Sequence, residues 1–402
     1  MSLDLGFVRS QFPALENGWA YFDNAGGSQV LAGVANRVRD YMLTSSVQTG
    51  ATYETSQTAS ARLAQARGRI ATFMGAERPE EIVFGPSTTV LVRFLATAMA
   101  SQLSAGDEII LTDFDHESNI GPWLILKDRG VVFRTWQIDP NTLTPRIEDL
   151  QKLMTARTRL VCVTHTSNIL GSINPIREIA DAVHAGGARL CVDGVAYAPH
   201  RAIDVREIGA DYYVFSFYKT YGPHFAAMYG RYDHLLELDG LYHYFYGKDK
   251  VPAKLEPGNP CYELAWGTAG IVDYFETLGG GSGRAAIENA FEKITAHEAA
   301  IGERLLSFLR DRNGVRIVGS RTSDPALRVP TISFTVDGKT PEEIVLGTDK
   351  SRIGIRHGDF HSRRLAEAIG LGAPGAVRVS MVHYNTMEEV DRLIEALSQA
   401  MH

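Results

Sequence analysis

From about residue 60 to residue 230, the sequence alternates between helical and strand-like segments. Short apolar strands are predicted at 81–84, 108–111, 131–136, 160–164, 190–192, 212–215 and 225–229. Helices are predicted at 58–74, 90–103, 123–127, 147–154 and 176–185. Strands that alternate with helices are typical of parallel strands joined by helical crossovers. We therefore expect an α/β chain whose large domain is a doubly wound, mostly parallel sheet.

The pattern changes after about residue 283. A long helical segment passes through 304–306, strands are predicted at 315–318 and 332–336, and a helix is predicted at 387–401. Fewer strands and less regular alternation indicate a smaller α+β domain at the C-terminal end.

Composition limits the classes of protein to which the chain can belong. Its 402 residues are 45% hydrophobic and 22% charged, as in ordinary globular proteins. A net charge of −7 argues against a nucleic acid or an anionic membrane as partner. The N-terminus lacks a signal-peptide pattern, and the three cysteines lack metal-ligand spacing. We expect a cytoplasmic protein without structural disulfides, a bound metal or a membrane span.

Polar residues gather where the predicted strands end. Parallel strands end at one edge of a sheet, and ligands bind beyond that edge. The residues that fall there are Thr88, Thr89, Asp115, His116, His165, Asn168, Asp193, Ser216 and Lys219. This convergence predicts a ligand site at the carboxyl edge of the sheet.

Lys219 lies in a turn between two predicted strands, flanked by aromatic residues. Burial favours the neutral amine, which can form a Schiff base with an aldehyde cofactor. By itself the turn favours an ordinary surface lysine, because most lysines are exposed. Asp193, at the end of an earlier strand, could likewise be a helix cap. Together the two residues are the pair that a pyridoxal 5'-phosphate (PLP) enzyme needs, because a buried carboxylate keeps the pyridine nitrogen protonated.

Two further segments fit that cofactor. The turn at 85–89 places small hydroxyl residues at the start of a helix, where free N–H groups suit a phosphate, although a plain helix cap is the alternative. His116 could be a capping or core histidine. Its functional interpretation is an imidazole stacked on the cofactor ring, where it can also move protons.

These segments resemble the class V aminotransferase family of fold-type I PLP enzymes, most closely its cysteine desulfurase and selenocysteine lyase branch. The resemblance runs from Tyr21-Phe22-Asp23-Asn24-Ala25 to Arg378-Val379-Ser380. It implies a PLP-binding large domain at 20–282, a small domain formed by 1–19 and 283–402, and a homodimer. PLP is the expected cofactor and an amino acid the expected substrate.

The resemblance also implies roles for single residues. Lys219 matches the Schiff-base lysine, Asp193 the partner of the pyridinium nitrogen and His116 the ring-stacking histidine. Thr88, Thr89 and Ser216 match phosphate ligands, and Thr268 matches a threonine that serves the other subunit's site. Substrate contacts are implied for Arg378, which matches the arginine that grips the α-carboxylate, for Asn168, which also lies near the cofactor, and for Asn24.

One departure from the family concerns the small-domain loop. Where desulfurases carry a catalytic cysteine, this chain has His361, which we take as a candidate catalytic residue. Cys162 and Cys191 fall in predicted buried strands, and Cys261 is treated as structural. Other departures are Ala196 and Tyr218, which replace a frequent glutamine and a frequent histidine.

Three functions remain open at this stage. The first is a desulfurase-like carbon–sulfur lyase or a related β-elimination enzyme, since simple β-elimination needs no cysteine nucleophile. The second is an aminotransferase that converts an amino acid to a keto acid. The third is a PLP-binding protein without catalysis that serves as a partner or sensor.

Overall fold

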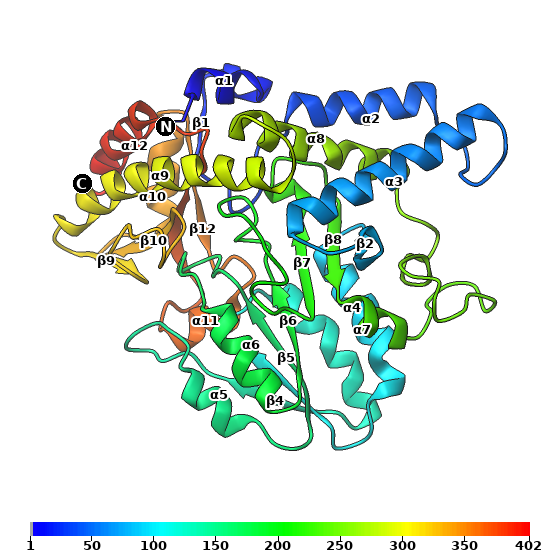
Figure 1. Ribbon diagram of the computed structural model, residues 1–402. Coiled ribbons are helices and arrows are strands. Elements are labelled where there is room, and N and C mark those ends of the chain that lie inside the picture. Colours follow the sequence, from blue (N-terminus) through cyan, green and yellow to red (C-terminus); the bar gives the residue numbers. More distant parts are fainter. Residues whose placement is uncertain (1–2) are drawn as a thin grey trace.

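A seven-stranded sheet forms the centre of the computed structural model, which describes residues 3–402 (Figure 1). Its strand order is β2-β8-β7-β6-β5-β3-β4. The strands are β2 (Ile82–Gly85), β3 (Glu108–Thr112), β4 (Val132–Trp136), β5 (Thr158–Thr164), β6 (Arg189–Asp193), β7 (Tyr212–Ser216) and β8 (Ala226–Gly230). β8 runs antiparallel to both neighbours, whereas the pairs from β7 to β4 are parallel. The predicted doubly wound, mostly parallel sheet is confirmed.

Both faces of this sheet are buried except at the edge strand β4, and alternate residues of the buried strands belong to different cores. In β5, Val161 and Val163 lie in one apolar cluster, while Leu160 and Cys162 lie in the other. The first cluster includes α3 (Glu54–Met74), α5 (Ile147–Leu153), α6 (Ile176–Ala185), α8 (Tyr262–Gly279) and the first half of α9 (Gly283–Arg310). The second includes α4 (Thr88–Met99), the 3-10 helix η5 (Gly121–Arg129) and α7 (Tyr232–Glu237). Burial on two faces explains why these strands read as continuous apolar runs.

Three helices that pack around the large sheet were not predicted from sequence, namely α2 (Ala32–Thr44), α7 and α8. Glycines lower the intrinsic helix propensity of α8. The glycines allow α8 to pack closely against α2. A Cβ on Gly267 would lie 2.6 Å from Val38 Cγ2, and one on Gly270 would lie 3.1 Å from the backbone nitrogen of Val34. Close approach to α2 therefore outweighs propensity. The segment predicted as a helix at 123–127 is the 3-10 helix η5, which has Pro122 in its first turn.

A smaller antiparallel sheet, of order β12-β13-β10-β9, forms the second unit. Its strands are β9 (Val315–Val318), β10 (Thr331–Val336), β12 (Arg356–Gly358) and β13 (Ala376–Ser380). Their core includes the second half of α9, α10 (Pro341–Asp349) and α12 (Met387–Ala400), which lie together on the left of Figure 1. The short strand β1 (Ala20–Tyr21) pairs with β11 (Ile353–Gly354), so Ala20 and Phe22 join this core. The predicted α+β unit is thus present.

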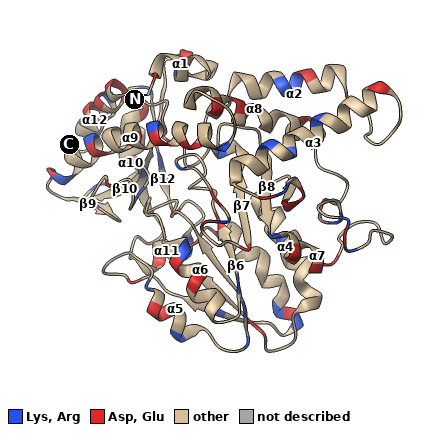
Figure 2. Cartoon of the chain, viewed as in Figure 1, with Lys and Arg blue, Asp and Glu red and all other residues tan. Residues whose placement is uncertain are grey.

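Two short helices complete the described chain, α1 (Leu5–Ser10) and α11 (Arg363–Ala368). Figure 2 shows acidic and basic residues interspersed along the outer helices. Within residues 3–402, none of the helices combines the length and the apolar character that a membrane crossing requires.

Candidate active site

A pocket lies at the carboxyl ends of β5, β6 and β7, the edge at which the sequence predicted a site. Seven of the predicted site residues line it, namely Thr88, Thr89, His116, Asn168, Asp193, Ser216 and Lys219. They come from five separate segments of the chain. The parallel topology brings these segments together because every contributing strand ends at this edge.

Lys219 ends the short 3-10 helix η6 (Phe217–Lys219), which follows β7 directly. Its side chain is buried, and the Nζ atom lies 5.7 Å from the centre of the Tyr218 ring. Burial, reinforced by the charge of Arg378, lowers the pKa of Lys219 to about 8. The amine is therefore a much better nucleophile near neutral pH than an ordinary lysine.

Asp193 is the last residue of β6, and its carboxylate faces the same pocket. It is buried, and the backbone N–H of Val195 donates to its Oδ1 over 2.9 Å. Burial raises the pKa of Asp193, while that hydrogen bond and the charge of Lys219 act in the opposite direction. A protonated ring nitrogen placed beside this carboxylate would compensate its buried charge.

The other end of the pocket is rich in hydroxyl groups at the start of α4. Ser87 caps this helix, and Thr88 Oγ1 lies 2.7 Å from Ser216 Oγ. Thr166 Oγ1 lines the same pocket and is buried without a hydrogen-bond partner among the described residues. Free N–H groups of the first helical turn and unsatisfied hydroxyl groups form a suitable cradle for a phosphate.

His116 lines the pocket from the cap of the 3-10 helix η4 (Glu117–Asn119). Its Nδ1 atom accepts from the backbone N–H of Ser118 over 3.0 Å and lies 2.9 Å from Ser118 Oγ. Burial, followed by the charge of Lys219, lowers the pKa of His116 to about 3. The ring is therefore neutral at physiological pH, which suits stacking on a flat ligand.

Arg378, on β13, is almost fully buried beside the pocket. Its Nη2 donates to Asp23 Oδ1 over 2.8 Å, and its Nη1 lies 3.3 Å from the Asn168 carbonyl oxygen. The guanidinium carbon lies 3.9 Å from the centre of the Phe360 ring. Its Nε atom is buried and has no hydrogen-bond partner among the described residues.

His361 lies on the loop between β12 and α11, and this loop is held over the pocket by Asn168. Asn168 Nδ2 donates to the Phe360 carbonyl over 3.0 Å, and Ser362 Oγ donates to Asn168 Oδ1 over 2.8 Å. The backbone N–H of Glu117 donates to the His361 carbonyl over 2.9 Å. Asn168, predicted as a cofactor and substrate ligand, lines the pocket and also anchors this loop.

Two predicted site residues lie away from the pocket. Asn24 is buried, and its Nδ2 donates to the carbonyls of Ser380 over 2.8 Å and Tyr21 over 2.9 Å. It joins the end of β1 to β13, and its neighbour Asp23 is the residue that reaches Arg378. Thr268 lies inside α8, is 0% exposed, and donates to the Ala265 carbonyl over 2.7 Å. Thr268 therefore offers no surface to a second subunit, and its placement does not support the predicted role.

The cysteines lie outside the pocket. Cys162 and Cys191 are buried register partners in β5 and β6. Cys261 precedes α8, and burial raises its pKa to about 11, so its thiol stays protonated.

Three residues at the site were not singled out from sequence: Asp23, Ser118 and Thr166. Asp23 pairs with Arg378, Ser118 orients the His116 ring, and Thr166 adds a hydroxyl group to the pocket. Ser118 and Thr166 each follow a strand end that the sequence had marked, so a wider window at those ends would have found them. The pairing of Asp23 with β13 has no local sequence signal.

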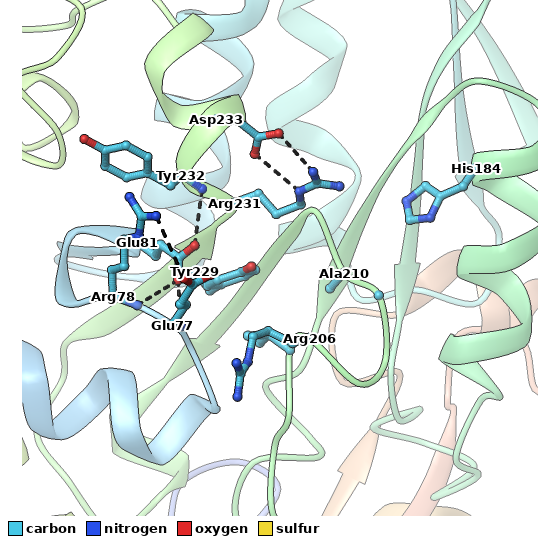
Figure 3. A pocket seen from close by; sticks show the side chains of 12 residues that line it. Glu77, Arg78, Glu81, His184, Arg206, Ala210, Tyr229, Arg231, Tyr232 and Asp233 are labelled. Carbon is cyan, nitrogen blue, oxygen red and sulfur yellow. Dashed lines mark hydrogen bonds and ion pairs between the residues drawn. The ribbon is translucent and has the colours of Figure 1, made fainter.

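A larger cavity lies at the opposite edge of the sheet, where β7 begins and β8 ends (Figure 3). Its charged groups already have partners among neighbouring side chains or backbone groups. Arg231 Nη2 lies 2.9 Å from Asp233 Oδ2, and the Tyr232 backbone N–H donates to Glu81 Oε1 over 3.3 Å, as Figure 3 shows. The pocket around Lys219, with its unsatisfied polar atoms, is therefore the candidate active site.

Comparison with known proteins agrees with this geometry. The family model for Aminotransferase class-V matches residues 20–393. The chain belongs to the class-V aminotransferase family. The aminotransferase-like protein FGM3 of Gibberella zeae is 44% identical over 100% of this chain and 99% of its own length. The cysteine desulfurase-like protein ustD of Aspergillus flavus is 33% identical over 99% of this chain and 90% of its own.

Solved structures of class-V members have the same fold. A cysteine desulfurase from Thermococcus onnurineus superposes with a TM-score of 0.88 at 25% identity, covering 98% of this chain and 97% of that one. The match to the class-V aminotransferase model and the relatives named as cysteine desulfurases identify the chain as a PLP-dependent enzyme of the cysteine desulfurase-like group. This identification agrees with the prediction from sequence.

The pocket of this chain fits the cofactor on which the family depends. Lys219 supplies a buried amine, Asp193 a buried carboxylate, and Thr88 and Ser216 a hydroxyl cradle at a helix start. The unpartnered hydroxyl of Thr166 is the clearest sign that a polar ligand completes the site.

Proposed function

We propose that this protein binds PLP through Lys219 and catalyses β-elimination from an amino acid, with carbon–sulfur bond cleavage as the first reaction to test. The observation that carries the proposal is the placement of Lys219 and Asp193 in one pocket. A buried amine with its pKa lowered to about 8 lies with a buried carboxylate beyond the ends of neighbouring strands. When bound, PLP withdraws electrons from the Cα atom of an attached amino acid and makes its Cα–H acidic.

The residues around the pocket divide the remaining tasks. Arg378 binds the α-carboxylate through its guanidinium group, while Asp23 fixes the position of that group. This contact orients the Cα–H bond. Lys219 would hold PLP through its Nζ atom, and the same atom would serve as the base that removes the Cα proton.

His361 is placed to act on the substituent at Cβ. It lies where the pocket opens outward, with its ring centre 5.5 Å from that of His116. As the Cβ–substituent bond breaks, the leaving group takes the electron pair of that bond and a proton from His361. When the substrate is cysteine, elimination leaves a three-carbon unsaturated amino acid. Water hydrolyses this product, which releases ammonia and gives pyruvate. Imidazole cannot accept a sulfur atom as a cysteine thiolate does, so sulfide is expected rather than an enzyme-bound persulfide.

An assay of products and absorption spectra together tests this proposal. The purified holoenzyme is mixed with a panel of amino acids that includes L-cysteine, and sulfide, pyruvate and alanine are measured. Equal amounts of sulfide and pyruvate, with the original visible band regained, support β-elimination. Alanine with sulfide would indicate desulfuration instead, and some other group would then have to accept the sulfur.

The same experiment distinguishes the other two functions. Lasting conversion to the pyridoxamine form, reversed by a keto acid, would identify an aminotransferase, the activity named in the most similar of the relatives described above. A spectrum that no amino acid changes would indicate a protein that binds PLP without catalysis.

A further inference from the structure

A second cavity, here called the vestibule, opens directly from the pocket. The two cavities adjoin, because Thr89, His116 and Ser118 line both of them. The other walls of the vestibule come from α4, from the start of η5 and from the small-domain loop, and they include Val90, Arg93, Glu117, Pro122 and His361. A substrate side chain that extends from the pocket past His116 therefore reaches the vestibule.

Arg93 is the charged residue of the vestibule that lacks an ion pair. It lies one helical turn after Thr89 on α4, and residues four apart share a face of a helix. Its Nη1 is 3.4 Å from the Pro122 carbonyl oxygen, and among residues 3–402 no carboxylate lies within 4.0 Å of its guanidinium. Glu117, which lines the same vestibule, is paired with Arg364 over 3.2 Å.

The two ends of the site thus offer two separate cationic groups. Arg378 is buried beside the pocket and takes the α-carboxylate in the proposed function. Arg93 is exposed and lines the vestibule together with His116 and His361. Between them, Val90 and Pro122 provide apolar contacts for methylene groups. An amino acid with an acidic group at the end of its side chain has the matching order of charges.

We propose that the vestibule is the side-chain subsite of this enzyme and that Arg93 selects substrates whose side chain ends in a carboxylate. This inference rests on the proposed function, because it assumes that an amino acid binds at Lys219 and Arg378. The planar guanidinium matches a carboxylate with two parallel hydrogen bonds, which a side-chain amide cannot reproduce.

The test compares acidic amino acids with their neutral amides. Holoenzyme is titrated with L-aspartate, L-glutamate, L-asparagine and L-glutamine, and the apparent Kd is taken from the change in the visible spectrum. We expect the better acid to bind at least about tenfold more tightly than its amide, and Arg93→Gln to remove about ten- to hundredfold of the acid's affinity while changing the amide's less than about threefold. Arg93→Lys should lose an intermediate amount, since it keeps the charge and loses the fork.

Arg129→Gln is the matched control, because Arg129 is an exposed arginine of η5 outside the vestibule. It should leave every Kd unchanged. Cofactor content of each variant shows whether the pocket is intact. Acids that bind no better than amides to the wild type, or an acid preference that survives in Arg93→Gln, would overturn the subsite while leaving the proposed function standing. A wild-type spectrum that no amino acid perturbs would overturn both.

Discussion

The rings of His116 and His361 face each other across the mouth of the pocket, 5.5 Å apart between centres and tilted by 55°. One comes from the large sheet and the other from the small-domain loop. Burial keeps His116 neutral, with a pKa of about 3, so its contribution near neutral pH is a flat, uncharged face. In the proposed function, protonation of the leaving group therefore falls to His361, which also lines the vestibule.

The first prediction concerns His361. Replacing His361 with glutamine should lower turnover by about 10²- to 10⁴-fold, the usual contribution of a general acid or base, because the leaving group loses its proton donor. Cofactor content and the visible spectrum should stay as in the wild type, since His361 does not line the inner pocket. His357→Gln, on the adjacent strand β12, is the control and should retain activity. A parallel loss of cofactor would place His361 in the binding shell instead.

The second prediction is a pH dependence of cofactor capture by Lys219. Its pKa is lowered from 10.5 to about 8, mainly by burial, and the neutral amine is the reactive form. The neutral fraction therefore rises about tenfold per pH unit below pH 8 and levels off above it. The rate of covalent PLP binding by the apoprotein should follow this curve. For a lysine of ordinary pKa, the binding rate would still increase with pH at pH 10.

Stopped-flow absorption of apoprotein mixed with PLP measures this rate between pH 6 and pH 10. Lys219→Ala provides the control: cofactor bound by this variant should not be fixed to protein by borohydride. Borohydride fixation that survives the substitution would assign the covalent link to another lysine.

The sequence predicted the inner pocket well because its residues follow strands directly. Thr88, Asp193 and Lys219 each lie within four residues of a buried strand, and a parallel topology sends all such positions to one edge. Predictions from short motifs were weaker. The Gly267-Thr268 pair matched in letters, but α8 begins before it and buries the threonine. No local pattern shows whether such a pair opens a helix or lies within one.

Contacts between the two units were beyond sequence reasoning. Asn168 and Ser362 lie 194 residues apart, and nothing in either segment indicates that the amide of one holds the hydroxyl of the other. That contact depends on how two separately formed cores meet, which periodicity and propensity do not encode. Asp23 and Arg378 both belong to the small unit but lie 355 residues apart, and neither segment carries a local signal of their pairing.

The third prediction follows from the Asn168–Ser362 contact. Ser362→Ala removes the hydrogen bond from Ser362 Oγ to Asn168 Oδ1, a loss of about 1 kcal/mol for the closed loop. We expect faster amide hydrogen exchange at 359–363 and a lower turnover number, with cofactor content unchanged. Ser398→Ala, on α12 at the far side of the small unit, should change neither property. Unaltered exchange at 359–363 would mean that other contacts suffice to hold the loop.

The last prediction concerns Gly171, which ends the loop that carries Asn168. Gly171 has a φ of +68°, and a Cβ there would lie 2.2 Å from the Thr331 carbonyl oxygen and 3.1 Å from Arg328 Nη2. Both neighbours are held: Arg328 is buried and donates to the Thr331 carbonyl over 2.6 Å. Gly171→Ala must therefore push the loop away from β10, and we expect destabilisation of about 3 kcal/mol or more.

Gly187→Ala separates backbone strain from the steric clash. Gly187 has a φ of +77°, but a Cβ there would meet no atom within 4 Å. Its substitution should lower the free energy of unfolding by about 1–2 kcal/mol, the energy needed to hold alanine in the left-handed conformation. Urea unfolding of both variants should place the Gly171→Ala midpoint well below that of Gly187→Ala, with activity reduced only in the former because Asn168 and the His361 loop move with Gly171. Equal midpoints would show that the loop can shift at no cost, and the proposed rigidity of the Asn168 anchor would be wrong.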